Sequence, residues 1–208
     1  MSTPLSNDFP LFPLQLVVLP SEMVPLHIFE ERYKTMIAEC LRAQREFGVV
    51  WLADDGLREV GCACRIERVL EELEDGRMNL LTRGTNPFRV VERQSHLPYP
   101  AGIVEFLPDA QEQVDRTLRA AAQSAYADLV RKATDKDPDG KQLERMSAYE
   151  MAATVDFGLD AKQGLLDLRS ENARLRLVTR LFRAAHKRLD FVDRAQARAK
   201  SNGKVRFG

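Results

Sequence analysis

The apolar residues of this chain change their spacing near residue 109. Before that point they form short runs separated by turn residues such as Asp54-Asp55-Gly56 and Asp75-Gly76. Short apolar runs with turns between them predict an antiparallel barrel or sandwich. Beyond residue 109 the apolar residues recur every three or four positions, which is typical of amphipathic helices. Strands followed by helices predict an α+β fold.

One helical pattern interrupts the strands of the first half. A common face predicts a helix over 30–47, and it carries Tyr33, Met36, Ile37, Cys40 and Leu41. Asp75-Gly76 between two apolar runs predicts a hairpin. Pro20 ends the first strand because proline has no N–H to donate. The predicted strands are 15–19, 49–53, 61–73, 78–82, 88–91 and 102–107.

The second half reads as helices joined by short polar segments. The predicted helices begin at 109, at the capping box Ser147–Glu150, at Asp160 and at Glu171, with a polar loop over 134–141. The last helix is expected to end near Ala195. These boundaries predict a β-rich lobe over 1–108, a helical lobe over 109–195 and a flexible basic tail over 196–208.

Charge is balanced over the whole chain and uneven along it. Lys and Arg number 31, as do Asp and Glu, yet residues 171–208 hold eleven basic and three acidic residues. This basic end would suit an anionic partner such as RNA. The simpler interpretation, which we favour, is a basic helix face lying against an acidic body and followed by a solvated tail.

The location expected from the sequence is the cytoplasm. No apolar run approaches the roughly 20 residues that a membrane-spanning helix needs. The first residues lack the basic start and apolar core of a secretory signal. Three cysteines, an odd number, fit a reducing compartment better than a disulfide framework.

The common catalytic motifs are absent from the sequence. It contains no H-E-x-x-H, no phosphate-binding P-loop, no G-x-S-x-G and no G-x-G-x-x-G. His27, the candidate base, lacks an evident nucleophile and an orienting group, so we interpret it as structural. The sequence therefore predicts a protein that is not an enzyme, with no catalytic residue and no cofactor.

Cys62-Ala63-Cys64 is the most specific remaining candidate for a metal site. Residues two apart in a strand share a face, so both thiols could reach one metal ion. A structural zinc site takes four ligands, and C-x-C is not its usual spacing. We therefore interpret Cys62 and Cys64 as buried core thiols and predict no metal site. Trp51 is likewise interpreted as core.

Three stretches together resemble the N-terminal substrate-binding domain of Lon protease. They are "FPLFPLQLVVLPSEMVPLHIFEERYKTMI", "EVGCACRIERVLEELEDGRMNLLTRGTNPFRVV" and "AKQGLLDLRSENARLRLVTRLF", and the resemblance covers about residues 9–195. It implies a PUA-like β-barrel lobe with one inserted helix, followed by a helical bundle. Because the sequence ends at Gly208 without a P-loop, it looks like the stand-alone bacterial Lon-domain proteins, which lack the ATPase and protease domains.

The resemblance implies a non-catalytic module that binds unfolded or exposed apolar segments of other proteins. Such a module would use an apolar groove or an exposed patch between the two lobes. The alternative is an RNA-binding protein, since PUA-like folds elsewhere serve RNA and residues 171–208 are basic. An unrecognised hydrolase is a third, weaker hypothesis. The sequence assigns no residue to the binding surface and leaves self-association and any partnership with a Lon protease open.

Overall fold

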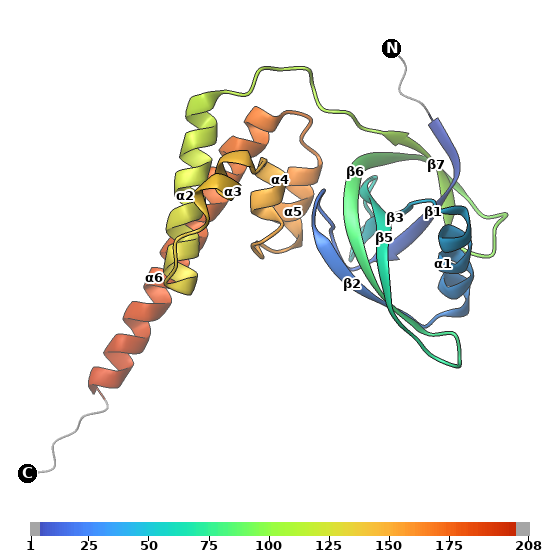
Figure 1. Cartoon of the computed structure of the whole chain (residues 1–208), viewed down its shortest axis with the longest axis horizontal. Helices are drawn as coiled ribbons and strands as arrows, with labels where there is room; N and C mark the ends of the chain where they lie inside the picture. Colours follow the sequence, from blue (N-terminus) through green and yellow to red (C-terminus); the bar gives the residue numbers. More distant parts are fainter. Residues whose placement is uncertain (1–4, 203–208) are drawn as a thin grey trace, which may run out of the picture. The chain divides into compact units, whose positions relative to one another are not determined.

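The computed structural model describes residues 5–202 (Figure 1). The strands are β1 Leu5–Leu14, β2 Met23–Ile28, β3 Phe47–Ala53, β4 Gly56–Leu57, β5 Val60–Glu72, β6 Met78–Gln94 and β7 Ala101–Phe106. The helices are α1 Glu31–Ala43, α2 Arg116–Thr134, α3 Gly140–Arg145, α4 Ala148–Ala152, α5 Leu159–Leu166 and α6 Glu171–Asn202. The predicted α+β class with a C-terminal helical part is confirmed.

The chain divides into two compact units whose boundaries differ from the predicted lobes. The first, here the barrel unit, comprises 1–112 and 149–171; the second, the helical unit, comprises 113–148 and 172–208. The stretch 149–171 thus joins the strands, although its helical pattern had placed it with 109–195. The predicted tail over 196–208 also differs in part, because α6 continues to Asn202. Residues 203–208 lie outside the described residues.

The barrel unit is built on a ring of five strands. β1 pairs with β7, β7 with β6, β6 with β5, β5 with β3, and β3 returns to β1. The closing β1–β3 pair is parallel, with Leu11 opposite Gly48, whereas the other pairs of the ring are antiparallel. β2 lies outside the ring and pairs with the first part of β6. Closure leaves no open edge in the ring itself.

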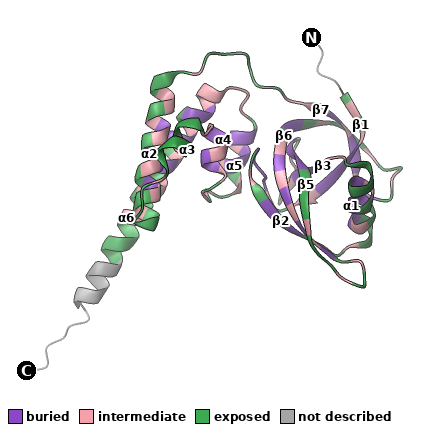
Figure 2. Ribbon diagram, in the orientation of Figure 1, coloured by how far each residue is buried: buried purple, intermediate pink, exposed green. Residues whose placement is uncertain are grey.

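Aromatic side chains fill the ring. Phe9 meets Phe88 and Phe106 edge to face, with ring centroids 5.4 and 5.6 Å apart. The core cluster comprises Phe9, Leu11, Val50, Ala63, Phe88 and Val104. Buried positions recur along the strands, whereas residues 191–195 of α6 are all exposed (Figure 2). Gly48 lies against this core, where an added Cβ would come within 2.3 Å of the Phe88 ring.

The sequence predicted the first strand in the wrong place. Val17, Val18 and Leu19 are buried as expected, yet residues 15–19 form no strand. The strand is instead β1, Leu5–Leu14. Its sequence contains two prolines, which are uncommon inside strands because proline has no N–H to donate. Side-chain bonding replaces a ladder near residue 19, because the Glu22 carboxylate accepts from the Leu19 N–H at 2.9 Å.

β6 merges two predicted strands into one of 17 residues. On one edge it pairs with β2 as far as Arg83 and with β7 from Phe88 onward. Pro87 lies in the gap between these partners, where its missing N–H leaves no ladder bond unmade. The loop before β2 fills part of the gap, since Gly84 exchanges hydrogen bonds with Ser21 and Glu22 at 2.8 and 2.9 Å.

α5 is attached to the barrel by buried polar contacts. Lys162 Nζ lies 2.5 Å from Glu22 Oε1, and both side chains are only 11% exposed. Gln163 donates from Nε2 to the carbonyl oxygen of Val60 at 3.2 Å. These contacts explain why 149–171 belongs with the strands.

In the helical unit, α2 and α6 run in the same direction and are joined by polar contacts near both ends of α2. Near the start of both helices, Asn172 Oδ1 accepts from the Asp115 N–H at 2.8 Å. Near the end of α2, Lys132 Nζ lies 3.0 Å from Asp190 and 2.6 Å from Asp193. Asp115 caps α2 by accepting from the N–H groups of its first turn. The predicted polar loop over 134–141 overlaps α3, which begins at Gly140 after an Asp139 cap.

Candidate functional site

A cleft of about 780 Å³ opens in the barrel unit. The end of β1, the first turn of α1, the β3–β4 hairpin and the segment between β6 and β7 line it. Its lining comprises Leu11, Pro13, Leu14, Tyr33, Leu52, Leu57, Leu97, Pro98, Tyr99, Pro100 and Ala101, with Glu30, Arg32, Arg93, Gln94 and Ser95 as polar members. We call it the barrel cleft. Its volume and mainly apolar lining suit a ligand-binding pocket.

The floor of the barrel cleft is part of the hydrophobic core. Leu11, Tyr33, Tyr99 and Ala101 are each no more than 5% exposed. Leu52, in contrast, is 45% exposed. A partner that covered Leu52 would therefore bury apolar surface against a floor that is already packed.

The segment between β6 and β7 is held rigidly against the barrel. The carbonyl oxygen of Pro100 accepts from the Leu11 N–H at 2.8 Å. The buried Tyr99 hydroxyl donates to the Glu39 carboxylate and accepts from Arg45 at 2.8 Å. Burial, with a contribution from Glu39, raises the pKa of Tyr99 to about 12, so this hydroxyl stays protonated at neutral pH. This wall of the cleft is thus pre-formed.

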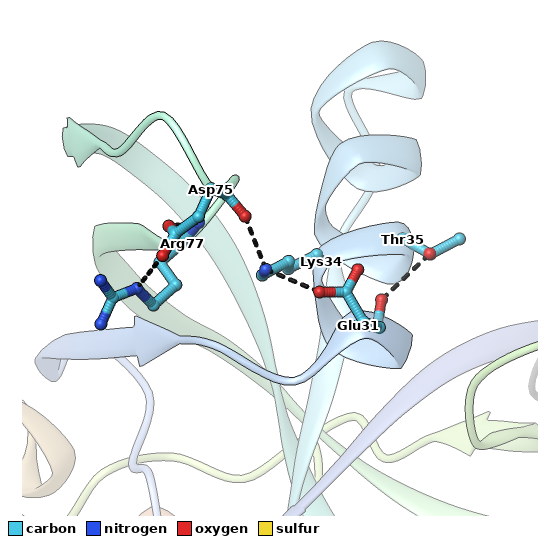
Figure 3. Close-up of polar contacts among 5 residues, drawn as sticks. All are labelled: Glu31, Lys34, Thr35, Asp75 and Arg77. Carbon is cyan, nitrogen blue, oxygen red and sulfur yellow. Dashed lines mark hydrogen bonds and ion pairs between the residues drawn. The ribbon is translucent and has the colours of Figure 1, made fainter.

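The first turn of α1, which contributes Tyr33 to the cleft, is attached to the tip of the β5–β6 hairpin (Figure 3). Lys34 Nζ donates to Glu31 Oε1 at 2.8 Å and to the carbonyl oxygen of Asp75 at 2.7 Å. At the tip, the Arg77 N–H donates to the Asp75 carboxylate, and this contact holds the Asp75 pKa below its ordinary value. A cation therefore links two elements distant in sequence.

Replacing Lys34 with methionine should loosen the hairpin tip without unfolding the barrel. The substitution keeps the aliphatic stem and removes the donor to Asp75. Amide hydrogen exchange at residues 73–77 is expected to rise about tenfold, as for the loss of one charge-assisted hydrogen bond. Arg42→Met, on the last turn of the same helix, is the control. Unchanged exchange at 73–77 in the Lys34 variant would show that the turn holds itself.

Two of the charged residues in the cleft neutralise each other. Arg32 donates from Nε to Glu30 Oε2 at 2.9 Å, and its guanidinium also lies over the Tyr33 ring, 4.5 Å from the centroid. Arg93, from the end of β6, is the third charged residue of the lining. The polar rim of the cleft thus carries a net positive charge.

His27 lies outside the barrel cleft, in an exposed hollow of about 500 Å³ across β2, β5 and β6. Its Nδ1 lies 2.7 Å from Asn79 Oδ1, and Asn79 Nδ2 donates to Glu71 at 2.7 Å. The ring also stacks on Phe29. The hydrogen-bond partner of His27 is thus the side chain of Asn79. Neither partner of this imidazole is a nucleophile, so the arrangement favours a structural role.

Cys62 and Cys64 are free and fully buried, as predicted. Burial raises the pKa of the Cys62 thiol well above its ordinary value, with Cys64 adding to the effect. A thiol kept protonated is a poor nucleophile and a poor metal ligand. Trp51, the other residue interpreted as core, is half-buried in β3 beneath the Arg58 guanidinium.

The remaining candidates are spread over both units. His96 pairs with Asp8 at 2.9 Å in the barrel unit, and His186 faces Asp190 at 3.5 Å in the helical unit. Across residues 5–202, no group of three or more His, Cys, Asp and Glu side chains is arranged to hold a metal ion. In the same described range, no helix has the length and apolar character to cross a membrane.

Sequence reasoning did not find the barrel cleft. Its lining comes from four segments that only the closed ring brings together. The one local signal for this site in the sequence is the proline-rich stretch His96–Pro100. Prolines restrict backbone freedom, so such a loop can form a fixed wall.

Comparison with known proteins identifies relatives over most of the chain. The family model of the ATP-dependent protease La (LON) substrate-binding domain matches residues 8–184. Lon protease of Desulfovibrio desulfuricans is 25% identical over 179 residues, which are 82% of this chain and 19% of that protein. Lon protease of Paraburkholderia phytofirmans is 26% identical over 187 residues, 82% of this chain and 22% of that protein. The chain thus spans about a fifth of the length of these curated relatives.

Solved structures show the same fold. The Lon N-terminal domain protein from Xanthomonas campestris superposes with a TM-score of 0.65 at 26% identity, covering 82% of this chain and 96% of that one. The N-terminal domain of Mycobacterium avium complex Lon protease gives a TM-score of 0.62 at 16% identity, covering 85% and 98%. Because its sequence identity is low, the second structure supports a shared fold and nothing more.

Proposed function

Because the chain belongs to the Lon substrate-binding domain family, we propose that it is a non-catalytic module that binds exposed apolar segments of other proteins in the barrel cleft. The observation that carries this proposal is the cleft itself, about 780 Å³ with mainly apolar walls, within the region matched by the family model. The three free cysteines support a reducing compartment, and we place the protein in the cytoplasm.

Binding would be driven by the burial of apolar surface on a pre-formed site. Leu52, Leu57 and Leu97 line the walls, and the core supplies the floor. Burying apolar surface contributes roughly 25 cal/mol per Å², so an apolar segment needs few polar contacts to bind. A rigid floor and a fixed 95–100 wall reduce the entropy that binding would otherwise cost.

The absence of sequence motifs for hydrolysis and the chemistry of the candidate residues favour a binding role. The buried thiol of Cys62 is held protonated, and His27 has no nucleophile among its partners. The RNA-binding alternative receives no support from the relatives named above. Client binding is expected to lack the steep salt dependence of nucleic-acid binding, because no phosphate contacts are made and no condensed counterions are released.

The test uses a chemically unfolded, fluorescently labelled protein as probe and anisotropy as readout. Leu52→Ser in the cleft should weaken binding about fivefold, as expected for the loss of a half-buried apolar contact. Leu70→Ser is the matched control, since Leu70 is also a strand leucine, 47% exposed against 45%, yet lies outside the cleft.

The control also separates two surfaces. Leu70 lines the hollow that contains His27, so a loss of binding in Leu70→Ser alone would move the site there. Equal affinity of the wild type and Leu52→Ser would contradict the proposed use of the barrel cleft. Competition by single-stranded RNA, with a steep salt dependence, would favour the nucleic-acid alternative.

A further inference from the structure

Of the three charged residues that line the barrel cleft, two pair with each other and the third does not. Glu30 and Arg32 form an ion pair, with Arg32 NH2 2.8 Å from Glu30 Oε2. Gln94, the neighbour of Arg93, accepts from the Asp8 N–H through Oε1 at 3.1 Å. Arg93 is exposed, and within residues 5–202 its guanidinium makes no hydrogen bond or ion pair. One cation at the rim of an apolar cleft is therefore uncommitted.

Two acidic residues at the cleft already have partners: Asp8, whose backbone contacts the lining residue Gln94, and Glu30, which belongs to the lining itself. Asp8 pairs with His96 at 2.9 Å. Glu30 is the one acidic member of the lining, and Arg32 neutralises it. The fold thus supplies the cleft with a positive charge and leaves the matching negative charge to a partner.

A guanidinium has a geometric preference as well as a charge. Its planar fork of N–H donors matches a carboxylate in a bidentate arrangement, which a compact ammonium group cannot reproduce. Arg93 lies at the end of β6, opposite Gly102 of β7, so its backbone is held in the ring, and Arg93 belongs to the lining of the cleft. The donor is thus positioned beside apolar walls without being buried.

We propose that the barrel cleft selects apolar segments that carry an acidic side chain, and that Arg93 recognises the carboxylate. This inference rests on the proposed function, since it assumes that client segments bind in this cleft. Charge complementarity argues for the occupant: the apolar walls take the aliphatic part, and Arg93 pairs with an Asp or Glu side chain at the rim. The exposed position of Arg93 suits a side chain that projects from a continuing segment.

Short fluorescent peptides of Leu, Val and Ser test the selection directly. Three versions carry one central Asp, Asn or Lys, all with acetylated and amidated ends, and a fourth carries Asn with a free terminal carboxylate. Wild-type protein should bind the Asp peptide about fivefold more tightly than the Asn peptide and more tightly still than the Lys peptide, as a bidentate pair at an exposed rim allows.

Variants of the receptor complete the experiment. Arg93→Gln should bind the Asp and Asn peptides equally, and Arg93→Glu should prefer the Lys peptide. Arg89→Gln is the matched control, because Arg89 is also exposed on β6 and lies outside the cleft. It should retain the wild-type preference. An Asp preference that survives Arg93→Gln, or equal binding of Asp and Asn peptides to the wild type, would overturn the inference.

The outcomes separate this inference from the proposed function. Equal binding of all peptides, weakened by Leu52→Ser, would leave the cleft as the client site and remove selection by Arg93. No binding of any peptide would overturn both. A preference for the free-carboxylate peptide that depends on Arg93 would contradict a side-chain carboxylate and assign the residue to chain ends.

Discussion

Replacing Gly84 with alanine is expected to destabilise the barrel unit by about 3 kcal/mol, at the upper end of the usual cost of overpacking. A Cβ at Gly84 would come within 2.1 Å of the Leu19 carbonyl oxygen, far inside van der Waals contact. The obstacle is backbone, so no flexible side chain can move aside. Relief would require the loop before β2 to shift, which would break the bonds of Gly84 to Ser21 and Glu22.

Urea unfolding followed by Trp51 fluorescence measures this effect, because Trp51 is the single tryptophan of the chain and lies in β3 of the barrel unit. Gly140→Ala is the control. An added Cβ there meets nothing within 4 Å, and Gly140 opens a helix, α3, where alanine is the better helix former. A Gly84 variant as stable as the wild type would show that residues 17–22 are mobile enough to accommodate the added methyl group.

Replacing Lys162 with methionine should also destabilise the barrel unit by about 3 kcal/mol, because removing one member of a buried ion pair leaves the other charge without compensation. Glu22 would keep its bond from the Leu19 N–H and lose its cationic partner. The same pair attaches α5 to the loop before β2, so the variant should also raise amide exchange along 159–166.

A double variant distinguishes loss of the pair from loss of packing. Glu22→Gln together with Lys162→Met removes both charges, and it should recover a large part of the stability lost in the single lysine variant. Arg65→Met is the control, since it breaks an ion pair with Glu67 in which Arg65 is 58% exposed. That change should be close to neutral. Additive effects of the two single variants would contradict direct coupling between Glu22 and Lys162.

Local pattern determined the elements whose stabilising contacts are close in sequence. The apolar face of Tyr33, Met36, Ile37, Cys40 and Leu41 predicted α1; the first four residues are buried, whereas Leu41 is 39% exposed. Asp75-Gly76 predicted the β5–β6 hairpin, where Gly76 adopts a positive φ of 76°. In both cases the signal is a spacing or a backbone preference that a few neighbouring residues express without the rest of the fold.

Tertiary structure decided the features that depend on distant partners. Val17-Val18-Leu19 has the composition of a strand, yet Glu22 and the packing around Gly84 hold it outside any ladder. The helical pattern of 159–166 could not show that Glu22 would bind Lys162 and place α5 with the barrel unit. The spacing of apolar residues shows which face of a helix is buried, but it does not show which element covers that face.

The barrel cleft is another feature that only the tertiary structure decided. Arg93 and Tyr33 are 60 residues apart in number, and closure of the β1–β3 pair brings their segments to one cleft. Whether an arginine is paired depends on which carboxylates reach it in three dimensions, so its free guanidinium carries no signature in the sequence. The sequence determined membership of the family and the nature of the elements, because these follow from local order; the site followed from ring closure, because its parts are held together by contacts across the whole barrel.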